Sequence, residues 1–581
     1  MRALRYLALT GLLALFCIPF LVPHHPWPLP SFYSEWWAGL CGLVASSVLL
    51  IGTPSGRLEI PRIALFPLGL IGLLLLQAAL GQVAYPGQAA FASLYLLWAM
   101  MLMLAARHFL LIWGTERLLG GLAWALLAGG LLNALAAVLQ FTKIDVPFFV
   151  TGSVNHVIYG NLAQANHLAD HLALAGLSLL YLLAKARLRL FYALPLGMLL
   201  LLGLALSGSR SAWLYLLAGL VLAYLLKRRL PGRAALVTLA GAGLALGVFY
   251  LLQFLLAQQG AYTANIRLGG LASSTALRLA FLKDAWQMFT EAPWLGIGFQ
   301  HHPWHHYLLR LAGTSDFAHM PGYEEVYAEN AHNIALHLLA EFGILAGLLL
   351  AGAGYWLYRS LRRADSLDHW WLASILLVIA IHSLLEYPLW FAYFLGIAAV
   401  AAACLEPKPF VLSVPDRSRL RLVGLIIALG IGVLTALIVG FSALERMHKL
   451  WGDKMRADAF EQIAPLLHTA QLVPFFEPQV DSFLASLPLY DQDSDKLTTL
   501  LELNTKVMQQ MANAKLLYRQ ATLLWALGRR TEAQAVLADA CKVYPDARKK
   551  YLADLEKMEP LYPRLAGLKQ QLLATVGPPA R

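Results

Sequence analysis

Residues 190–226 read LFYALPLGMLLLLGLALSGSRSAWLYLLAGLVLAYLL, which is two apolar stretches joined by a turn of small residues and one arginine. Each stretch is close to the length of about 20 residues that an α-helix needs to cross the hydrocarbon core of a bilayer. Basic residues flank the pair on both sides, from Lys185 to Arg189 and from Lys227 to Arg229. The pattern predicts two membrane-spanning helices whose basic ends lie on the same side.

The same pattern recurs along the first three quarters of the chain. Of the 581 residues, 59% are hydrophobic and 13% are charged, whereas a soluble domain carries about 25% charged residues. We therefore expect residues 1–444 to form an all-α, polytopic transmembrane bundle of about thirteen helices. The expected spans are roughly 5–22, 36–52, 63–83, 88–106, 118–141, 166–184, 190–207, 211–226, 234–257, 332–358, 367–385, 389–405 and 421–443.

Basic residues gather in alternate connections between these spans, beginning with Arg2 and Arg5. Because basic connections stay in the cytoplasm, we expect a cytoplasmic N-terminus, and the odd number of spans puts residues 445–581 outside. This distribution explains the net charge of +11 without a nucleic-acid partner. The four cysteines are too scattered for a disulfide framework or a CxxC metal site.

The polar tail, residues 445–581, reads as a small domain of short amphipathic helices. Residues 515–545 have the pattern of one tetratricopeptide-type (TPR-like) helical hairpin, with Gly528 at its turn and Pro545 at its end. Such a hairpin either binds a peptide or packs as a lid on the membrane body.

Polar residues cluster at the outer ends of the spans and in a large outer loop at 258–331. Long loops and polar groups at membrane depth are usually functional. In the first cluster, Asn166 and Asp170 share a helix face at i, i+4 spacing, as do His167 and His171. The alternative is a polar helix end that Asn166 caps.

The second cluster is Arg210, which lies among the small residues of the turn Ser207-Gly208-Ser209-Arg210-Ser211. A guanidinium fork matches phosphate oxygens, and small neighbours let a bulky anion approach, so Arg210 is a candidate phosphate ligand. The alternative is that Arg210 reaches the phosphates of ordinary membrane lipids.

The third cluster is in the outer loop, where a short amphipathic helix carries Arg278 and Lys283. Its apolar face consists of Leu277, Phe281, Ala285 and Met288. We expect this face to lie on the membrane. Residues 293–299, PWLGIGF, predict a turn of close backbone approach. Four histidines follow between His301 and His306, but Pro303 and the lack of a paired carboxylate argue against a metal site.

The fourth cluster combines two segments. Glu329-Asn330-Ala331-His332-Asn333 opens a helix from the outer side, and His382 and Glu386 share a face at the outer end of a later span. Several clusters at one level of the membrane point to a common site.

These residues resemble the bacterial protein O-oligosaccharyltransferases of the pilin-glycosylating (PglL) type, within the superfamily of O-antigen ligases (WaaL) and Wzy polymerases. Gly160, Gln164 and Asn166 are similar to a GxxxQxN pattern, and Ser209-Arg210 to an (S/N)SR turn. Residues 278–298 are similar to an R…W…P(h)xGhGh stretch. Residues 332–343 and the stretch HSLLEYPLW at 382–390 are the most specific matches.

The resemblance implies a GT-C-like glycosyltransferase with an undecaprenyl-pyrophosphate-linked oligosaccharide as donor. It implies that Arg210 and Arg278 stabilise the leaving pyrophosphate and that His332 is the general base, with Glu329 as an alternative. The remaining expected substrate-binding residues are Gln164, Asn166, His167, Lys283, Glu329, Asn333, His382, Glu386 and Tyr387. We expect no metal and no other cofactor.

The implied reaction is inverting, metal-independent, en bloc transfer to Ser or Thr hydroxyls of periplasmic or exported, pilin-like proteins. It would take place in the bacterial inner membrane, with the tail in the periplasm. Two related alternatives remain open, an O-antigen ligase acting on lipid A-core and a Wzy-type polymerase. A transporter of lipid or solute remains a more distant alternative, because it rests on helix number and buried polar groups alone.

Overall fold

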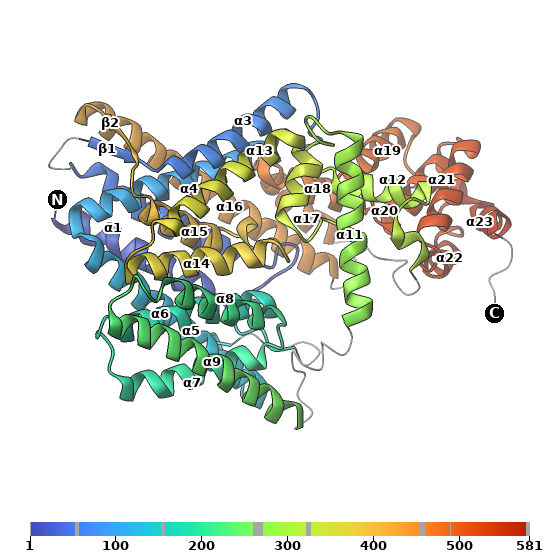
Figure 1. The fold of residues 1–581 in the computed structure, drawn as a ribbon. Coiled ribbons are helices and arrows are strands. Elements are labelled where there is room, and N and C mark those ends of the chain that lie inside the picture. Colours follow the sequence, from blue (N-terminus) through green and yellow to red (C-terminus); the bar gives the residue numbers. More distant parts are fainter. Residues whose placement is uncertain are drawn as a thin grey trace. The chain divides into compact units, whose positions relative to one another are not determined.

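The computed structural model describes residues 2–52, 57–150, 152, 157–258, 271–320, 327–452, 459–488 and 490–576 (Figure 1). Helices predominate among these residues, and two short strands, β1 (Arg57–Ile60) and β2 (Phe410–Ser413), pair antiparallel with Arg57 opposite Ser413. The chain forms two compact units. Unit 1 comprises Met1–Ile71, Ser93–Ala272 and Leu349–Val439, and unit 2 comprises Gly72–Ala92, Ser273–Leu348 and Gly440–Arg581.

A helix overlaps each of the thirteen predicted spans. The helices are α1 (Arg2–Leu15), α2 (Phe32–Ser46), α3 (Leu65–Ala79), α4 (Pro86–Trp113), α5 (Thr115–Thr142), α6 (Ala165–Ala184), α7 (Leu190–Leu206), α8 (Ser211–Leu226), α9 (Gly232–Gln258), α13 (Ile334–Arg362), α14 (Leu367–Ser383), α15 (Ala392–Leu405) and α16 (Asp416–Gly452). Among the described residues, seven helices are long and apolar enough to cross a membrane: α3, α4, α5, α6, α9, α13 and α16. The helices α7, α8, α14 and α15 are apolar but shorter. The protein is therefore a polytopic helical membrane protein.

Helix α6 is the centre of unit 1. It packs against α5, α7, α8, α9 and α14, and 83% of its apolar window is buried, compared with 56% or less in the other six long candidate spans. Large buried side chains such as Tyr181, Trp370 and Trp371 fill the core around it. Polar groups on α6 consequently face protein rather than lipid.

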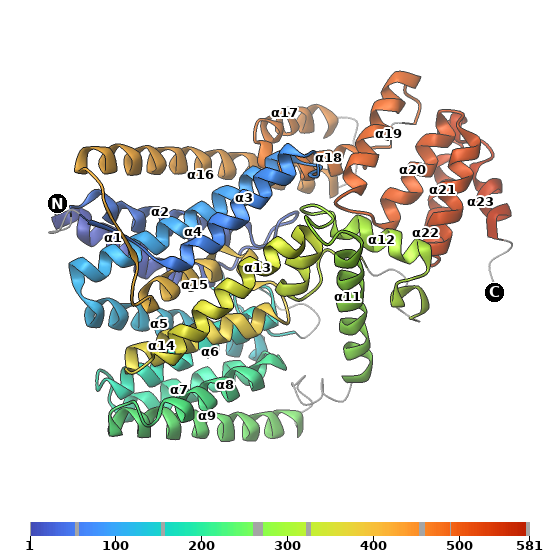
Figure 2. The same ribbon diagram turned by 45° about the horizontal axis from the view of Figure 1, so that its top comes forward.

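Unit 2 contains the described residues of the long loop from Ser273 onward and the tail. The loop forms α11 (Leu271–Glu291) and α12 (His302–Ala312). The tail forms α17 (Ala459–Gln471), α18 (Glu477–Leu484), α19 (Ser494–Met508), α20 (Ala514–Ala526), α21 (Arg530–Val543), α22 (Ala547–Met558) and α23 (Leu568–Val576) (Figure 2). Helices α20 and α21 occupy the range of the predicted hairpin, and Gly528 between them has φ +78°.

The tail and the outer loop share one hydrophobic core. Tyr307 of α12 belongs to the same buried cluster as Leu517 and Leu537. The guanidinium of Arg310 donates a hydrogen bond of 2.6 Å to the carbonyl of Val543. The predicted division of the chain at residue 444 concerns the membrane and stays a prediction.

The stretch PWLGIGF makes the close backbone approach that its glycines predict. Gly296 lies at φ +74°, and a Cβ there would be 2.2 Å from the carbonyl carbon of Glu341 in α13. Gly343 lies at φ +68° and interrupts the helical geometry of α13 at the same place. The amide of Ile297 donates to the carbonyl of Ala340 at 2.9 Å, so the turn satisfies a carbonyl that the interruption would leave free.

Gln77 of α3 closes this contact. Its amide nitrogen donates to the carbonyls of Leu295 and Glu341, each at 2.7 Å. Its amide oxygen accepts from the backbone of Phe299 at 3.1 Å. One buried side chain therefore joins the turn to α13 just before its break.

Buried histidines join α11, α12 and α13. Asp284 accepts hydrogen bonds of 2.8 Å from His306 and from the hydroxyl of Ser315. The ring of His302 lies 5.5 Å from that of His337. Among the residues that the structure describes, no three His, Cys, Asp or Glu side chains gather as ligands for a metal ion.

Gly296→Ala should destabilise unit 2 more than Gly313→Ala. Gly313 has a similar φ of +77°, but a Cβ added there would meet nothing within 4 Å. Both changes incur about 1–2 kcal/mol for the left-handed backbone, whereas Gly296→Ala adds about 1–3 kcal/mol for the clash. Thermal unfolding of the purified variants measures the difference, and equal midpoints would contradict the proposed contact.

The stability of unit 2 should fall on acidification. Burial, followed by repulsion from His337 and His306, lowers the pKa of His302 below its usual value. In the unfolded chain a histidine has a pKa of about 6.5, so below that pH the unfolded state binds more protons. The unfolding midpoint should drop between about pH 7.5 and about pH 5.5.

The matched variant is His302→Gln, which removes the titrating ring. Its midpoint is expected to be lower at both pH values, because a buried group has been changed. The drop between the two pH values should nevertheless be smaller than in the unchanged protein. An identical drop in both proteins would show that His302 does not carry this dependence.

Candidate functional site

The N-terminal end of α6 begins with an extended residue. The N-cap is Gln164, with φ −145° and ψ 126°, and its side chain makes no capping hydrogen bond. The possibility that Asn166 caps this helix is therefore wrong. Asn166 lies inside the first turn, and its side chain points to neighbouring elements instead.

Helices α6 and α14 are joined by pairs of polar side chains, one turn apart on each helix. The amide nitrogen of Asn166 donates to Glu386 at 3.3 Å, just beyond the end of α14. One turn further, the ring of His382 donates to Asp170 at 2.8 Å, and both side chains are fully buried. The i, i+4 faces expected from the sequence therefore face each other across an antiparallel seam.

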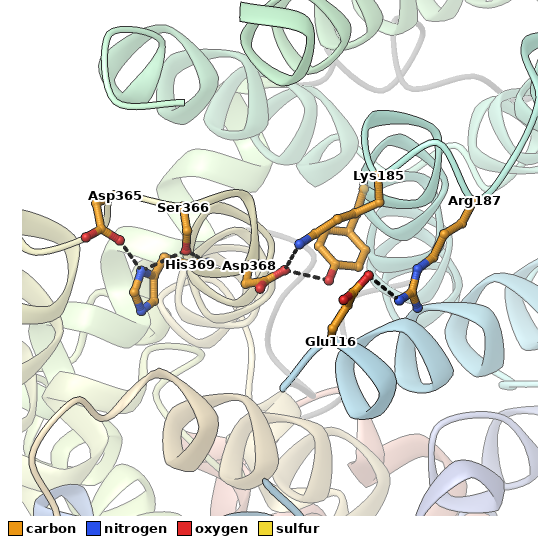
Figure 3. Close-up of polar contacts among 8 residues, drawn as sticks. Glu116, Lys185, Arg187, Asp365, Ser366, Asp368 and His369 are labelled. Carbon is orange, nitrogen blue, oxygen red and sulfur yellow. Dashed lines mark hydrogen bonds and ion pairs between the residues drawn. The ribbon is translucent and has the colours of Figure 1, made fainter. Parts of the chain in front are cut away.

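The seam continues to the other end of both helices. The indole of Trp371 donates to the hydroxyl of Ser178 at 3.1 Å. Asp368 accepts from the hydroxyl of Tyr181 at 2.7 Å and pairs with Lys185 at 2.8 Å. Figure 3 shows Asp368 and Lys185 pointing toward each other at this basic end.

Two further ion pairs lie nearby in the same view. Arg187, which follows α6, pairs with Glu116 of α5 at 2.8 Å, and His369 of α14 contacts Asp365 at 3.0 Å (Figure 3). Lys185 and Arg187 at this end of the bundle are thus paired with carboxylates. Contacts of this kind between exposed groups add little stability each.

The turn that carries Arg210 is held by the end of the seam at Asn166. The hydroxyl of Ser209 donates to the amide oxygen of Asn166 at 2.7 Å. The backbone N–H of Ser209 donates to the hydroxyl of Ser207 at 3.2 Å. Ser209 is buried, and the next residue, Arg210, is half-buried as the N-cap of α8.

His167 and Tyr387 lie in an aromatic group beside the seam. The ring of His167 is buried, lies 4.5 Å from that of Phe391, and is 3.2 Å from the hydroxyl of Tyr393. The ring of Tyr387 lies 5.0 Å from that of Trp390. Unit 1 therefore brings together seven predicted site residues. They are Gln164, Asn166, His167, Arg210, His382, Glu386 and Tyr387.

Helix α11 in unit 2 differs from its prediction. Phe281, Ala285 and Met288 are buried against protein, including Phe317 and Leu309, so the predicted membrane-facing surface is wrong. Helix α11 does have the predicted apolar face, but α12 and neighbouring elements cover this face. Between residues 275 and 291 of this helix, the exposed large apolar side chains are Leu279 and Trp286.

The basic residues of α11 remain accessible. Arg278 is half-buried. Lys283 is exposed and pairs with Asp316 at 2.5 Å. An exposed pair of this type is weak and can exchange for another anion.

His332 lies in a strained turn before α13. Its φ is +49°, which is uncommon for a residue with a side chain. Its backbone N–H donates to the side chain of Asn330 at 2.9 Å, and its ring lies 5.0 Å from that of Phe281. Asn333 accepts from the N–H of Leu336 at 3.1 Å and so caps the helix. Strain of this kind is often found at functional sites.

Glu329 lies close enough to His332 to interact with it electrostatically. Its side chain reaches solvent, yet protein around its carboxyl raises its pKa by desolvation, and attraction to His332 opposes the rise. Unit 2 therefore contains the remaining predicted site residues. They are Arg278, Lys283, Glu329, His332 and Asn333. That they meet Arg210 of unit 1 stays a prediction.

Ser209 and Asp170 were not among the predicted site residues. Asp170 had a signal in the sequence, because it shares a helix face with Asn166. Ser209 had only its place before Arg210. The contact between Ser209 and Asn166 joins residues 43 positions apart, which local spacing does not reveal.

Comparison with known proteins finds matches along most of the chain. Residues 195–351 match the family model described as O-Antigen ligase. Residues 370–556 match the model described as virulence factor membrane-bound polymerase, C-terminal. A relative from Acinetobacter baylyi, named general O-oligosaccharyltransferase, is 28% identical over 408 residues, which cover 68% of each chain. The resemblance inferred from the sequence motifs is confirmed, because two parts of the chain match the O-antigen ligase and membrane-bound polymerase models and the chain is similar to an O-oligosaccharyltransferase.

Proposed function

We propose that the protein transfers an oligosaccharide en bloc from undecaprenyl pyrophosphate to Ser or Thr hydroxyls of exported, pilin-like proteins. The observation that carries the proposal is the half-buried Arg210 on a turn of small residues, held at the polar end of the α6–α14 seam. Arginine in such a position suits a pyrophosphate. Transfer of an oligosaccharide to an oxygen atom is supported by the name of the Acinetobacter baylyi relative, general O-oligosaccharyltransferase.

In this reaction the acceptor oxygen attacks the anomeric carbon of the sugar and inverts it. The bond from this carbon to the pyrophosphate oxygen breaks, and its electron pair leaves with the pyrophosphate. Arg210 and Arg278 stabilise the growing negative charge. His332 accepts the proton of the acceptor hydroxyl, and Glu329 stabilises the imidazolium that forms.

The proposal places the protein in a bacterial inner membrane with a cytoplasmic N-terminus. The donor's pyrophosphate then lies at the outer headgroup level, and residues 445–581 lie in the periplasm. In that place the TPR-like pair α20 and α21 is available to an exported acceptor, or it supports the outer loop through the core shared with α12.

The test is transfer by the purified protein. Lipid-linked oligosaccharide and a pilin-like acceptor are incubated with it, and glycopeptide is measured by mass spectrometry. His332→Ala should reduce the rate by about 10²–10⁴-fold, because the proton acceptor is lost. Arg210→Ala and Arg278→Ala should each reduce it by about 10²–10³-fold.

The matched control is Arg187→Ala. This arginine pairs with Glu116 at the basic end of unit 1, and its loss should leave the rate unchanged. Glycan joined only to lipid A-core would replace the proposal with a ligase, and glycan joined only to lipid-linked glycan with a polymerase. Movement of labelled lipid across a vesicle membrane without any covalent product would indicate a transporter.

A further inference from the structure

The amide of Asn166 uses both of its polar atoms, and only one orientation fits. Its nitrogen donates to Glu386 at 3.3 Å, and its oxygen accepts from Ser209 at 2.7 Å. A carboxylate has acceptors only, so the nitrogen must face Glu386 and the oxygen must face Ser209. The chemistry of Glu386 therefore makes the hydroxyl of Ser209 a donor.

Ser209 is consequently held at two atoms. Its hydroxyl is bound by Asn166, and its backbone N–H is bound by the hydroxyl of Ser207. Its side chain is 1% exposed, so water does not compete for these bonds. The peptide that follows leads directly into Arg210, so these bonds fix the point from which the guanidinium side chain extends.

The pair Asp170–His382 keeps this arrangement in register. It lies one turn along both helices from Asn166 and Glu386, and both partners are 0% exposed. Loss of one partner in such a buried pair leaves an uncompensated polar group, which is strongly unfavourable. Helices α6 and α14 are thus fixed relative to each other close to the contacts of Asn166 with Glu386 and Ser209.

We propose that Glu386, Asn166 and Ser209 form a positioning chain that sets Arg210 for the pyrophosphate of the donor. This inference rests on the proposed function. It gives Asn166 and Glu386 a role different from the direct substrate binding that the sequence motifs imply. The chain acts through Arg210, and none of its three members needs to touch the substrate.

An exchange of the two side chains tests the proposal. Asn166→Asp alone places a second carboxylate about 3.3 Å from Glu386, and repulsion between them should break the contact. A displaced arginine lowers the transfer rate by about 100-fold. The double variant Asn166→Asp/Glu386→Gln restores one carboxylate and one amide, so it should recover most of the rate.

The recovery separates positioning from direct binding. In the double variant the carboxylate at position 166 still accepts from Ser209, so Arg210 is held as before. If the substrate instead bound the amide at 166 or the carboxylate at 386 directly, the double variant would present it with the wrong group at each position. The transfer rate would then not recover. Failure of the double variant to recover, with the protein folded, overturns the proposal.

A second readout uses Arg210 itself. In an Arg210→Ala background, Asn166→Asp should cause little further loss, because the group that it positions is already absent. If Asn166→Asp lowers the rate by the same factor in the Arg210→Ala background as in the unchanged protein, Asn166 acts independently of Arg210. Ser209→Ala should resemble Asn166→Asp, whereas Ser209→Thr, which keeps the hydroxyl, should lose less.

The matched control is Ser178→Ala. It removes the contact with Trp371 on the same seam, toward the other end of α6. It should lower the unfolding midpoint and leave the dependence of the rate on donor concentration unchanged. If the unchanged protein transfers glycan to no acceptor, the proposed function fails. If it transfers glycan and the exchange does not restore the rate, only the positioning chain fails.

Discussion

The buried contact between α6 and α14 is the constraint on which the arrangement of unit 1 depends. A helix at membrane depth satisfies its own backbone, but its polar side chains must find partners within the protein. Asp170 and His382 do so with each other, while Asn166 reaches Glu386 and Ser209. The polar groups that make α6 costly in lipid therefore also decide which helices surround it.

In unit 2, polar groups that would lack partners are satisfied by backbone hydrogen bonds rather than by charged side chains. The break at Gly343 would leave carbonyls of α13 without partners, and the turn at Gly296 supplies them. The residues before the break include His332 and Asn333, so the turn, the helix start and the predicted base form one continuous piece of structure. Packing of Phe281 beside His332 connects this piece to α11.

Much of the fold and of the candidate site was predictable from the sequence, and the features that were not predictable have physical causes. Apolar length predicts a helix near each expected span, and seven of these helices are long and apolar enough to cross a membrane. The i, i+4 spacing identifies the faces of Asn166 and His382. Spacing does not say which helix a face meets, so the partnership of Asn166 with Ser209 was missed. Periodicity predicts that a helix has an apolar face, but it does not say whether lipid or protein covers that face. The prediction that Phe281 and Met288 face the membrane was therefore wrong. The meeting of Arg210 with Arg278 and His332 stays a prediction.

The spacing of the contacts along α6 and α14 also limits sliding. A shift of α14 by one turn, about 5.4 Å, would bring His382 opposite Asn166 and leave both Asp170 and Glu386 without their partners. At the far end the same shift would separate Asp368 from Lys185. The two helices can therefore move as a single rigid body. Any movement that admits a bulky lipid or releases a product would then have to occur in other elements.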